Sequence, residues 1–158
     1  MIKAENTQIQ YSPNFPECKI SYSFDINLEN CPQVTTPEKA YEVFIEIWDM
    51  DTINYREEFV VLLLNNSKRV VGWSKISTGG SNATIVEPAM IFQVALLSHA
   101  NSMILAHNHP SGRMEASSAD TSLTKRLKEI GNILGIRIDD HLIISPYSFV
   151  SMNREKVL

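Results

Sequence analysis

Six consecutive apolar residues, Phe59 to Leu64, form the longest uninterrupted hydrophobic run in the chain. A membrane helix needs about 20 such residues, so this run is far too short to span a bilayer. A strand that is apolar on both faces has to be covered by other elements on each side of its sheet. The run therefore predicts a central β-strand in a layered fold, and we expect no membrane association.

The remaining elements are predicted from periodicity and capping residues. A hydroxyl followed by proline and an acid, Thr36-Pro37-Glu38, is typical of a helix start. Its apolar stripe continues to Trp48. The other expected strands lie over 69–77, where the chain returns as a hairpin, and over 102–107, 136–144 and 148–152. A second helix is expected over 88–100, and it should be buried because it is apolar nearly all round. A third helix has its apolar stripe over 123–134 and is closed by Gly135.

This order of elements excludes a purely parallel sheet, because two of the strand pairs follow each other without a helix between them. We expect an α/β fold with a mixed β-sheet flanked by helices on both faces. The length of 158 residues suits one domain. Residues 1–34 are rich in proline and short β-type runs, so we expect an extended N-terminal segment packed on a domain formed by 35–158.

The charge distribution does not favour a nucleic-acid partner. The net charge is −4, with four Lys/Arg against eleven Asp/Glu in residues 1–58 and ten against seven in residues 59–158. Proteins that bind nucleic acid mainly through phosphate contacts are usually basic. DNA therefore remains a possible partner that the charge does not support.

Two features indicate a cytoplasmic protein. The first residues, Met1 to Asn6, lack the apolar core of a secretion signal. In that setting the two cysteines, Cys18 and Cys31, are expected to be reduced thiols.

The stretch most informative about chemistry is Ala106-His-Asn-His-Pro-Ser-Gly112, followed by Ser117-Ser-Ala-Asp120. Residues i and i+2 of a strand share a face, so His107 and His109 can present both imidazoles to one point. The following helix can return Asp120 to the same point. Two nitrogens and one carboxylate would leave a fourth tetrahedral position for water, which is the arrangement of a catalytic zinc site.

Each part of this pattern also has a simpler interpretation. Two histidines after a strand can be no more than a polar turn. Ser117-x-x-Asp120 is a helix-capping pattern, in which the serine accepts from the main chain and the acid faces the helix dipole. Capping and metal ligation are compatible, since a residue in the first turn can do both.

The spacing His107-x-His109, seven residues, Ser117, two residues, Asp120 resembles the JAMM motif of JAB/MPN metalloproteases. The wider run from Ile104 to Gly112, with Asp140-His141-Leu142 downstream, is similar to the RadC-like branch of that family. The resemblance covers about Pro37 to Ser151. It implies a three-layer sandwich like that of cytidine deaminases. Full-length RadC proteins carry an N-terminal helix-hairpin-helix region, and we expect this chain to be a short form without it.

The resemblance also implies roles for particular residues. The family uses a zinc-activated water, a glutamate general base and a serine that stabilises the tetrahedral intermediate. The Glu-x-Phe spacing of the family selects Glu57 as the base and leaves Glu58 as a solvated acid. Ser117 is the expected oxyanion donor, and His107, His109 and Asp120 are the expected zinc ligands. His141 is expected to be a structural histidine, with a role as a partner behind the metal ligands as the less favoured alternative.

Two functions from different classes follow. The first is a zinc-dependent hydrolase of the JAMM type that cleaves a peptide or isopeptide bond in a peptide or protein substrate. The second is an accessory protein of DNA repair or of mobile elements, in which the metal site is secondary. A scaffold that binds metal without turnover is disfavoured by the complete motif.

Overall fold

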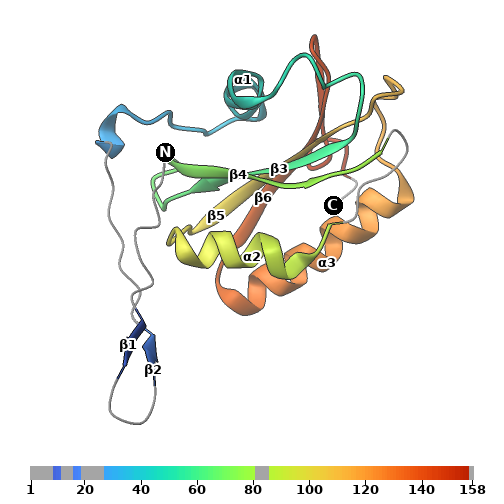
Figure 1. Cartoon of the computed structure of the whole chain (residues 1–158). Helices are drawn as coiled ribbons and strands as arrows, with labels where there is room; N and C mark the ends of the chain where they lie inside the picture. The colour runs from blue at the N-terminus through green and yellow to red at the C-terminus, as the bar shows by residue number, and fades with distance from the viewer. Residues whose placement is uncertain (1–8, 12–15, 19–26, 81–85, 157–158) are drawn as a thin grey trace.

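The apolar run lies in the middle of a mixed five-stranded sheet (Figure 1) in the computed structural model, which describes residues 9–11, 16–18, 27–80 and 86–156. The strands of this sheet are β3 (Glu58–Leu64), β4 (Val70–Thr78), β5 (Ser102–Asn108), β6 (Arg137–Ile144) and β7 (Phe149–Ser151). Their order is β4-β3-β5-β6-β7. β5 and β6 are parallel, whereas the other neighbouring pairs are antiparallel. All seven residues of β3 are buried, as expected of a central strand.

Helices cover both faces of this sheet, which confirms the α/β fold with a three-layer arrangement. In Figure 1, α1 (Pro37–Ile47) lies above the sheet, and α2 (Pro88–Leu97) and α3 (Ser118–Leu134) lie below it. The side chains of β3 alternate between the two layers. Val60 belongs to the core that contains Phe44 of α1, whereas Val61 belongs to the core that contains Phe92 of α2 and Leu127 of α3.

The helix boundaries follow from local chemistry. The side chain of Thr36 accepts a hydrogen bond from the Lys39 amide, and Pro37 occupies the first helical position of α1. Gly135 closes α3 in the left-handed conformation, with a φ of 71°. Both boundaries confirm the sequence analysis.

The expectation that the second helix is buried all round was wrong. α2 ends at Leu97 and buries only one face, which contributes Ile91, Phe92 and Ala95 to the core. Met90, Leu96 and Leu97 are exposed. The reason is the position of α2 in an outer layer, where only one face of a helix can meet the sheet.

The N-terminal part contributes a separate two-stranded antiparallel sheet, β1 (Ile9–Tyr11) with β2 (Pro16–Cys18), and a short 3₁₀ helix, η1 (Leu28–Asn30). Just after η1, Gln33 pairs with Arg69 beside the main sheet, and Val34 is buried in the core. Most of the expected packing of residues 1–34 falls on positions outside the described residues. Within the described part of the chain, no helix has the length and hydropathy needed to cross a bilayer.

Candidate metal centre

The C-terminal end of β5 brings the two motif histidines together. Along β5, Met103 and Leu105 face the layer of α2 and α3, and His107 continues that face. His107 is almost fully buried, and His109 follows one residue after the strand ends. Their Nε2 atoms lie 2.9 Å apart. The expected convergence of the two imidazoles on one point is therefore present.

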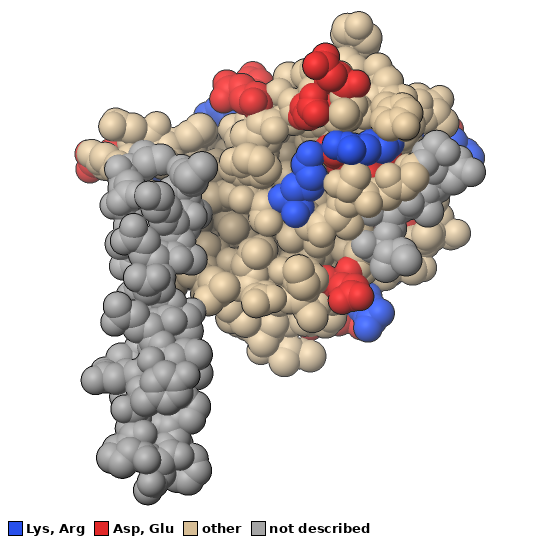
Figure 2. All heavy atoms as spheres, in the orientation of Figure 1, with Lys and Arg blue, Asp and Glu red and all other residues tan. Residues whose placement is uncertain are grey.

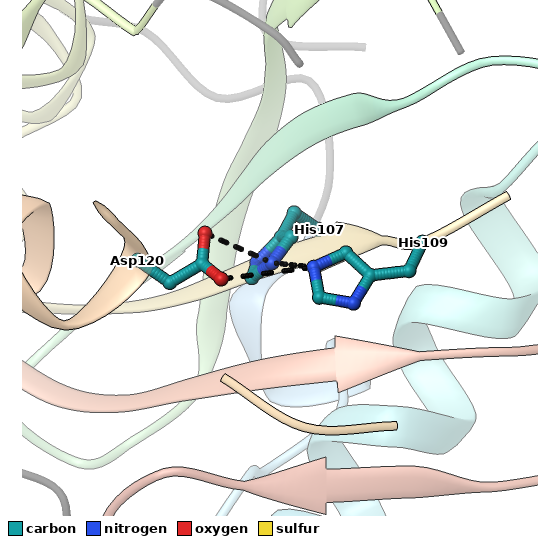
Figure 3. A group of neighbouring side chains, drawn as sticks. All are labelled: His107, His109 and Asp120. Carbon is teal, nitrogen blue, oxygen red and sulfur yellow. Dashed lines mark hydrogen bonds and ion pairs between the residues drawn. The ribbon is translucent and has the colours of Figure 1, made fainter. Parts of the chain in front are cut away.

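Asp120 reaches the same point from the first turn of α3 (Figure 3). Its Oδ1 lies 3.3 Å from Nε2 of His107, and its Oδ2 lies 3.7 Å from Nε2 of His109. Asp120 also forms a capping box with Ser117, since its amide donates to the Ser117 hydroxyl and its carboxylate accepts from the Ser117 amide. The capping geometry and the approach to the histidines thus occur in the same residue.

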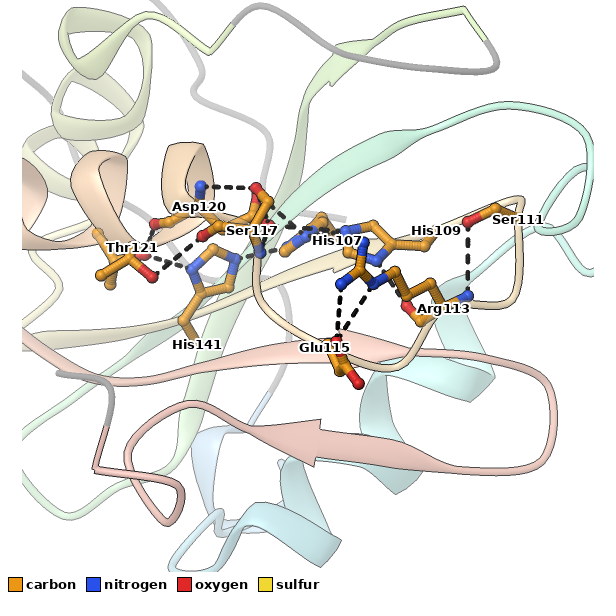
Figure 4. A network of polar contacts seen from close by, with 10 residues as sticks. His107, His109, Ser111, Arg113, Glu115, Ser117, Asp120, Thr121 and His141 are labelled. Atoms are coloured by element: carbon orange, nitrogen blue, oxygen red, sulfur yellow. Dashed lines mark hydrogen bonds and ion pairs between the residues drawn. The ribbon is translucent and has the colours of Figure 1, made fainter.

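Ser117 orients this carboxylate. Its hydroxyl donates to Oδ2 of Asp120 at 2.6 Å, and its main-chain amide donates to the same oxygen at 2.7 Å (Figure 4). Oδ1 is left to face His107. The serine expected to act on a substrate is therefore in contact with the proposed metal-binding carboxylate.

A chain of hydrogen bonds behind His107 sets the position of its proton. The Thr124 hydroxyl donates to the main-chain oxygen of Asp120 at 2.6 Å, because a carbonyl oxygen can only accept. The same hydroxyl must then accept from Nδ1–H of His141, also at 2.6 Å. The lone pair of His141 therefore lies on Nε2 and accepts from Nδ1–H of His107 at 2.8 Å. Neutral His107 consequently has its lone pair on Nε2, facing Asp120.

His109 is oriented in the same sense by the loop that follows it. Its Nδ1 lies 2.6 Å from the main-chain oxygen of Arg113, so Nδ1 carries the proton and donates. The loop turns back through Gly112, whose positive φ of 75° suits glycine, and the Gly112 amide donates to the His109 carbonyl. Neutral His109 therefore also presents its Nε2 lone pair to the shared point.

The close approach of these side chains and their burial shift the pKa values of His109, Asp120 and His141 when no metal is bound. The adjacent Asp120 carboxylate raises the pKa of His109 above its usual 6.5, against the opposing effect of burial. Burial alone would raise the pKa of Asp120, but the adjacent rings of His107 and His109, when they carry a proton toward it, outweigh burial and hold that pKa far below its usual range. Complete burial lowers the pKa of His141 well below 6.5, which keeps that ring neutral.

The donor set fits a divalent transition metal. Two nitrogen lone pairs and a carboxylate directed at one point repel one another unless a cation or proton lies between them. Zinc binds nitrogen and oxygen at about 2.0–2.2 Å, so tetrahedral ligand atoms are about 3.3–3.5 Å apart. The two Nε2 atoms lie 2.9 Å apart, and the nearest Asp120 oxygens lie 3.3 Å (Oδ1) and 3.7 Å (Oδ2) from them, which is close to that value. His107, His109 and Asp120 therefore form a group that could hold a metal ion.

Glu57 lies immediately before β3, beside this group. β3 pairs Phe59 with His107, and extending this antiparallel register by two residues places Glu57 opposite His109. The negative charge of Glu57 contributes to the raised pKa of His109, in keeping with that position. The Glu57 side chain is half-buried.

The expectation that Glu58 is a solvated acid was wrong. Its side chain is fully buried and makes ion pairs with Nε of Arg56 at 2.9 Å and with Nζ of Lys75 at 2.8 Å. Strand alternation turns Glu58 to the face opposite Phe59, where these two basic side chains compensate its charge.

In the sequence analysis, a role for His141 as a partner of a metal ligand ranks below a purely structural one. His141 is fully buried, as expected of a structural histidine, but it directly contacts His107. The sequence did indicate that His141 lies in the strand predicted directly after the helix that carries Asp120. The parallel pairing of β5 with β6, which puts His141 opposite Leu105, could not be derived from the sequence.

Comparisons with known proteins agree with this geometry. A family model described as RadC-like JAB domain matches residues 34–157. Among curated proteins, a UPF0758 protein of Flavobacterium johnsoniae is 47% identical over 97 residues, which cover 60% of this chain and 42% of that protein.

Two further UPF0758 proteins extend the match. The one from Pelobacter propionicus is 39% identical over 132 residues, which cover 83% of this chain and 56% of that protein. The one from Desulforamulus reducens is 42% identical over 126 residues, which cover 79% of this chain and 54% of that protein. The chain spans about half the length of the curated relatives it matches. Together with the strand-end histidines and the capping aspartate, these matches show that the chain belongs to the RadC-like JAB domain family.

Proposed function

We propose that this protein is a zinc-dependent hydrolase that cleaves a peptide or isopeptide bond in a peptide or protein substrate. The proposal rests chiefly on one observation: Nε2 of His107 and Nε2 of His109 lie 2.9 Å apart, and each lies within 3.7 Å of a carboxylate oxygen of Asp120. Membership of a JAB-domain family supports it.

In this proposal His107, His109 and Asp120 hold the ion. Zinc bound there would lower the pKa of a coordinated water to about 7 and polarise a substrate carbonyl. Zinc is the preferred assignment because two imidazoles and one carboxylate suit it, although related divalent ions accept the same donors.

Glu57 and Ser117 supply the remaining chemistry. Glu57 acts as the general base, taking a proton from the attacking water and delivering it to the leaving amine. Glu57 is half-buried beside the metal-binding group, a position that suits proton transfer to and from a water molecule. Ser117 donates to the developing oxyanion once its hydroxyl rotates from Asp120 toward the substrate.

Neither the net charge of −4 nor the face drawn in Figure 2 supports the DNA-associated alternative. On the face drawn in Figure 2, acidic and basic side chains occur in small groups separated by neutral surface. A phosphate backbone is normally bound by a continuous basic track. A protein or peptide substrate is therefore the proposed partner.

Metal content tests the first half of the proposal. Protein purified without added metal should contain close to one equivalent of zinc, and zinc should raise the thermal stability of stripped protein. Asp120→Ala should bind zinc far more weakly, because one of three protein donors is lost. Less than about a tenth of an equivalent, with no stabilisation by added zinc, would refute the metal site.

Turnover tests the second half. Zinc-loaded protein should hydrolyse members of a library of end-blocked peptides and lysine-linked isopeptides. Glu57→Gln should retain zinc but lose about 10²–10⁴-fold in kcat, because the amide cannot take up a proton. The matched control is Glu129→Gln, which makes the same change at an exposed position of α3. Full activity of Glu57→Gln would show that the base is misassigned.

A further inference from the structure

Asn108 lies between the two motif histidines but faces the opposite side of the sheet. Strand alternation directs His107 and His109 toward α3, so the side chain between them points toward the layer of α1. Asn108 is 1% exposed and has no role in the proposed chemistry. A buried amide needs partners for two donor hydrogens and an acceptor oxygen.

All the partners of this amide belong to one short segment of main chain. Nδ2 donates to the carbonyl of Ile53 at 2.5 Å and to the carbonyl of Arg56 at 2.8 Å. Oδ1 accepts from the amide of Glu58 at 2.8 Å. The side chain of Asn108 therefore fixes residues 53–58 to the end of β5 through three hydrogen bonds.

This segment contains Glu57, which is tied down from its other side as well. The Glu57 amide donates to the carbonyl of Gly80 at 3.1 Å, and the Gly79 amide donates to the carbonyl of Glu57 at 2.8 Å. The main chain of Glu57 is thus held between the end of β4 and the Asn108 side chain. On the Asn108 side, the ion pairs of buried Glu58 with Arg56 and Lys75 add to the restraint.

We propose that Asn108 is a positioning residue, which fixes the main chain on both sides of Glu57 and so sets the placement of the general base relative to the two histidines on the same strand. This inference rests on the function proposed above. It links the base to the metal centre through a side chain that contacts neither the metal group nor the substrate.

The chemistry of the site explains why asparagine is required there. An aspartate has the same shape and can still accept from the Glu58 amide, but it would place an oxygen against the carbonyl oxygens of Ile53 and Arg56. Two hydrogen bonds would be replaced by repulsion. Asn108→Asp therefore loosens the segment without changing side-chain volume.

Amide hydrogen exchange on the zinc-loaded full chain tests this directly. In Asn108→Asp, protection of the Glu57 and Glu58 amides should fall by about 10- to 100-fold, as expected when buried hydrogen bonds are lost. Protection of Leu105 in β5 should change by less than about three-fold, and zinc affinity should stay within about three-fold. The control is Asn132→Asp, the same substitution at an exposed position of α3.

Equal loss of protection at Leu105 and Glu57, or no loss at Glu57, would overturn the proposal. If Asn108→Asp does not fold, exchange in the unsubstituted protein decides. The Glu57 and Glu58 amides should then open together with that of Ala106 in β5. Exchange more than about 100-fold faster than that of Ala106 would show that the segment is not held by the strand.

Turnover provides a second readout that a purely structural role would not match. Asn108→Asp should lower kcat by about ten-fold or more and leave KM nearly unchanged, and it should cause no further loss in a Glu57→Gln background. An equal loss in both backgrounds would contradict positioning through Glu57. If the unsubstituted protein hydrolyses nothing in the library, the proposed function fails, whereas exchange and zinc affinity still decide the role of Asn108.

Discussion

Replacing Thr124 with valine isolates the hydrogen-bond chain behind His107. The two side chains have nearly the same shape, but valine lacks the hydroxyl that accepts from Nδ1–H of His141. His141 is fully buried, so no solvent replaces the lost acceptor. The ring must either keep an unpaired N–H or move its proton to Nε2.

The first outcome lowers stability, and the second opposes metal binding. If the proton of His141 moves to Nε2, Nδ1 of His107 has to accept, and the proton of His107 then lies on Nε2, where the metal would bind. If the proton of His141 stays on Nδ1, a buried N–H remains unpaired, which lowers the free energy of unfolding by about 1–3 kcal/mol. Loss of comparable outer contacts lowers metal affinity by about 10- to 100-fold in other sites. We expect a similar loss of zinc affinity here.

Competition with a chromophoric chelator at one fixed pH measures this affinity, and urea unfolding of metal-free protein measures the stability term. The matched control is Thr121→Val, because the Thr121 hydroxyl donates to the carbonyl four residues earlier, as Thr124 does, but has no described contact with His141. Comparing the two variants removes the effect of that helical hydrogen bond. Zinc dissociation constants that agree within about two-fold would refute the tautomer argument.

Two further predictions concern pH and packing. In metal-free protein the raised pKa of His109 should stabilise the fold fully below pH 6.5, and this contribution should disappear as the pH rises through that pKa. Asp120→Asn should lower the pKa in an NMR titration of the His109 ring, and an unchanged value would contradict the assigned cause. A Cβ at Gly131 would lie 2.3 Å from the Ile136 carbonyl oxygen, so Gly131→Ala should lower the free energy of unfolding by about 1–3 kcal/mol or more. Urea unfolding checks this, and a neutral result would show that the α3–β6 connection adjusts.

Sequence patterns sufficed where the determinants are local. The start of α1 at Thr36 and the end of α3 at Gly135 depend on residues within one turn of each boundary. β3 follows from a run of apolar residues that only a central strand can bury. His107, His109 and Asp120 were found because strand alternation and a helix cap fix their directions.

The sequence was insufficient where partners come from distant parts of the chain. Glu58 has the composition of a surface acid, and only the antiparallel pairing of β3 with β4 brings Lys75 to it. The contact between His141 and His107 depends on the register of β5 with β6, which shifts at Met103/Ile104. The exposed face of α2 depends on which layer the helix occupies. Each of these features requires the assembled sheet.

The alternation of β5 divides the candidate centre into two separately perturbable halves. On one face, His107 is restrained through His141 and Thr124, so changes along that path should act on metal affinity. On the other face, Asn108 restrains the main chain around Glu57, so changes there should act on kcat with the metal retained. A variant on either path that altered both quantities equally would mean that the strand itself had moved, because a one-residue change of register exchanges the two faces.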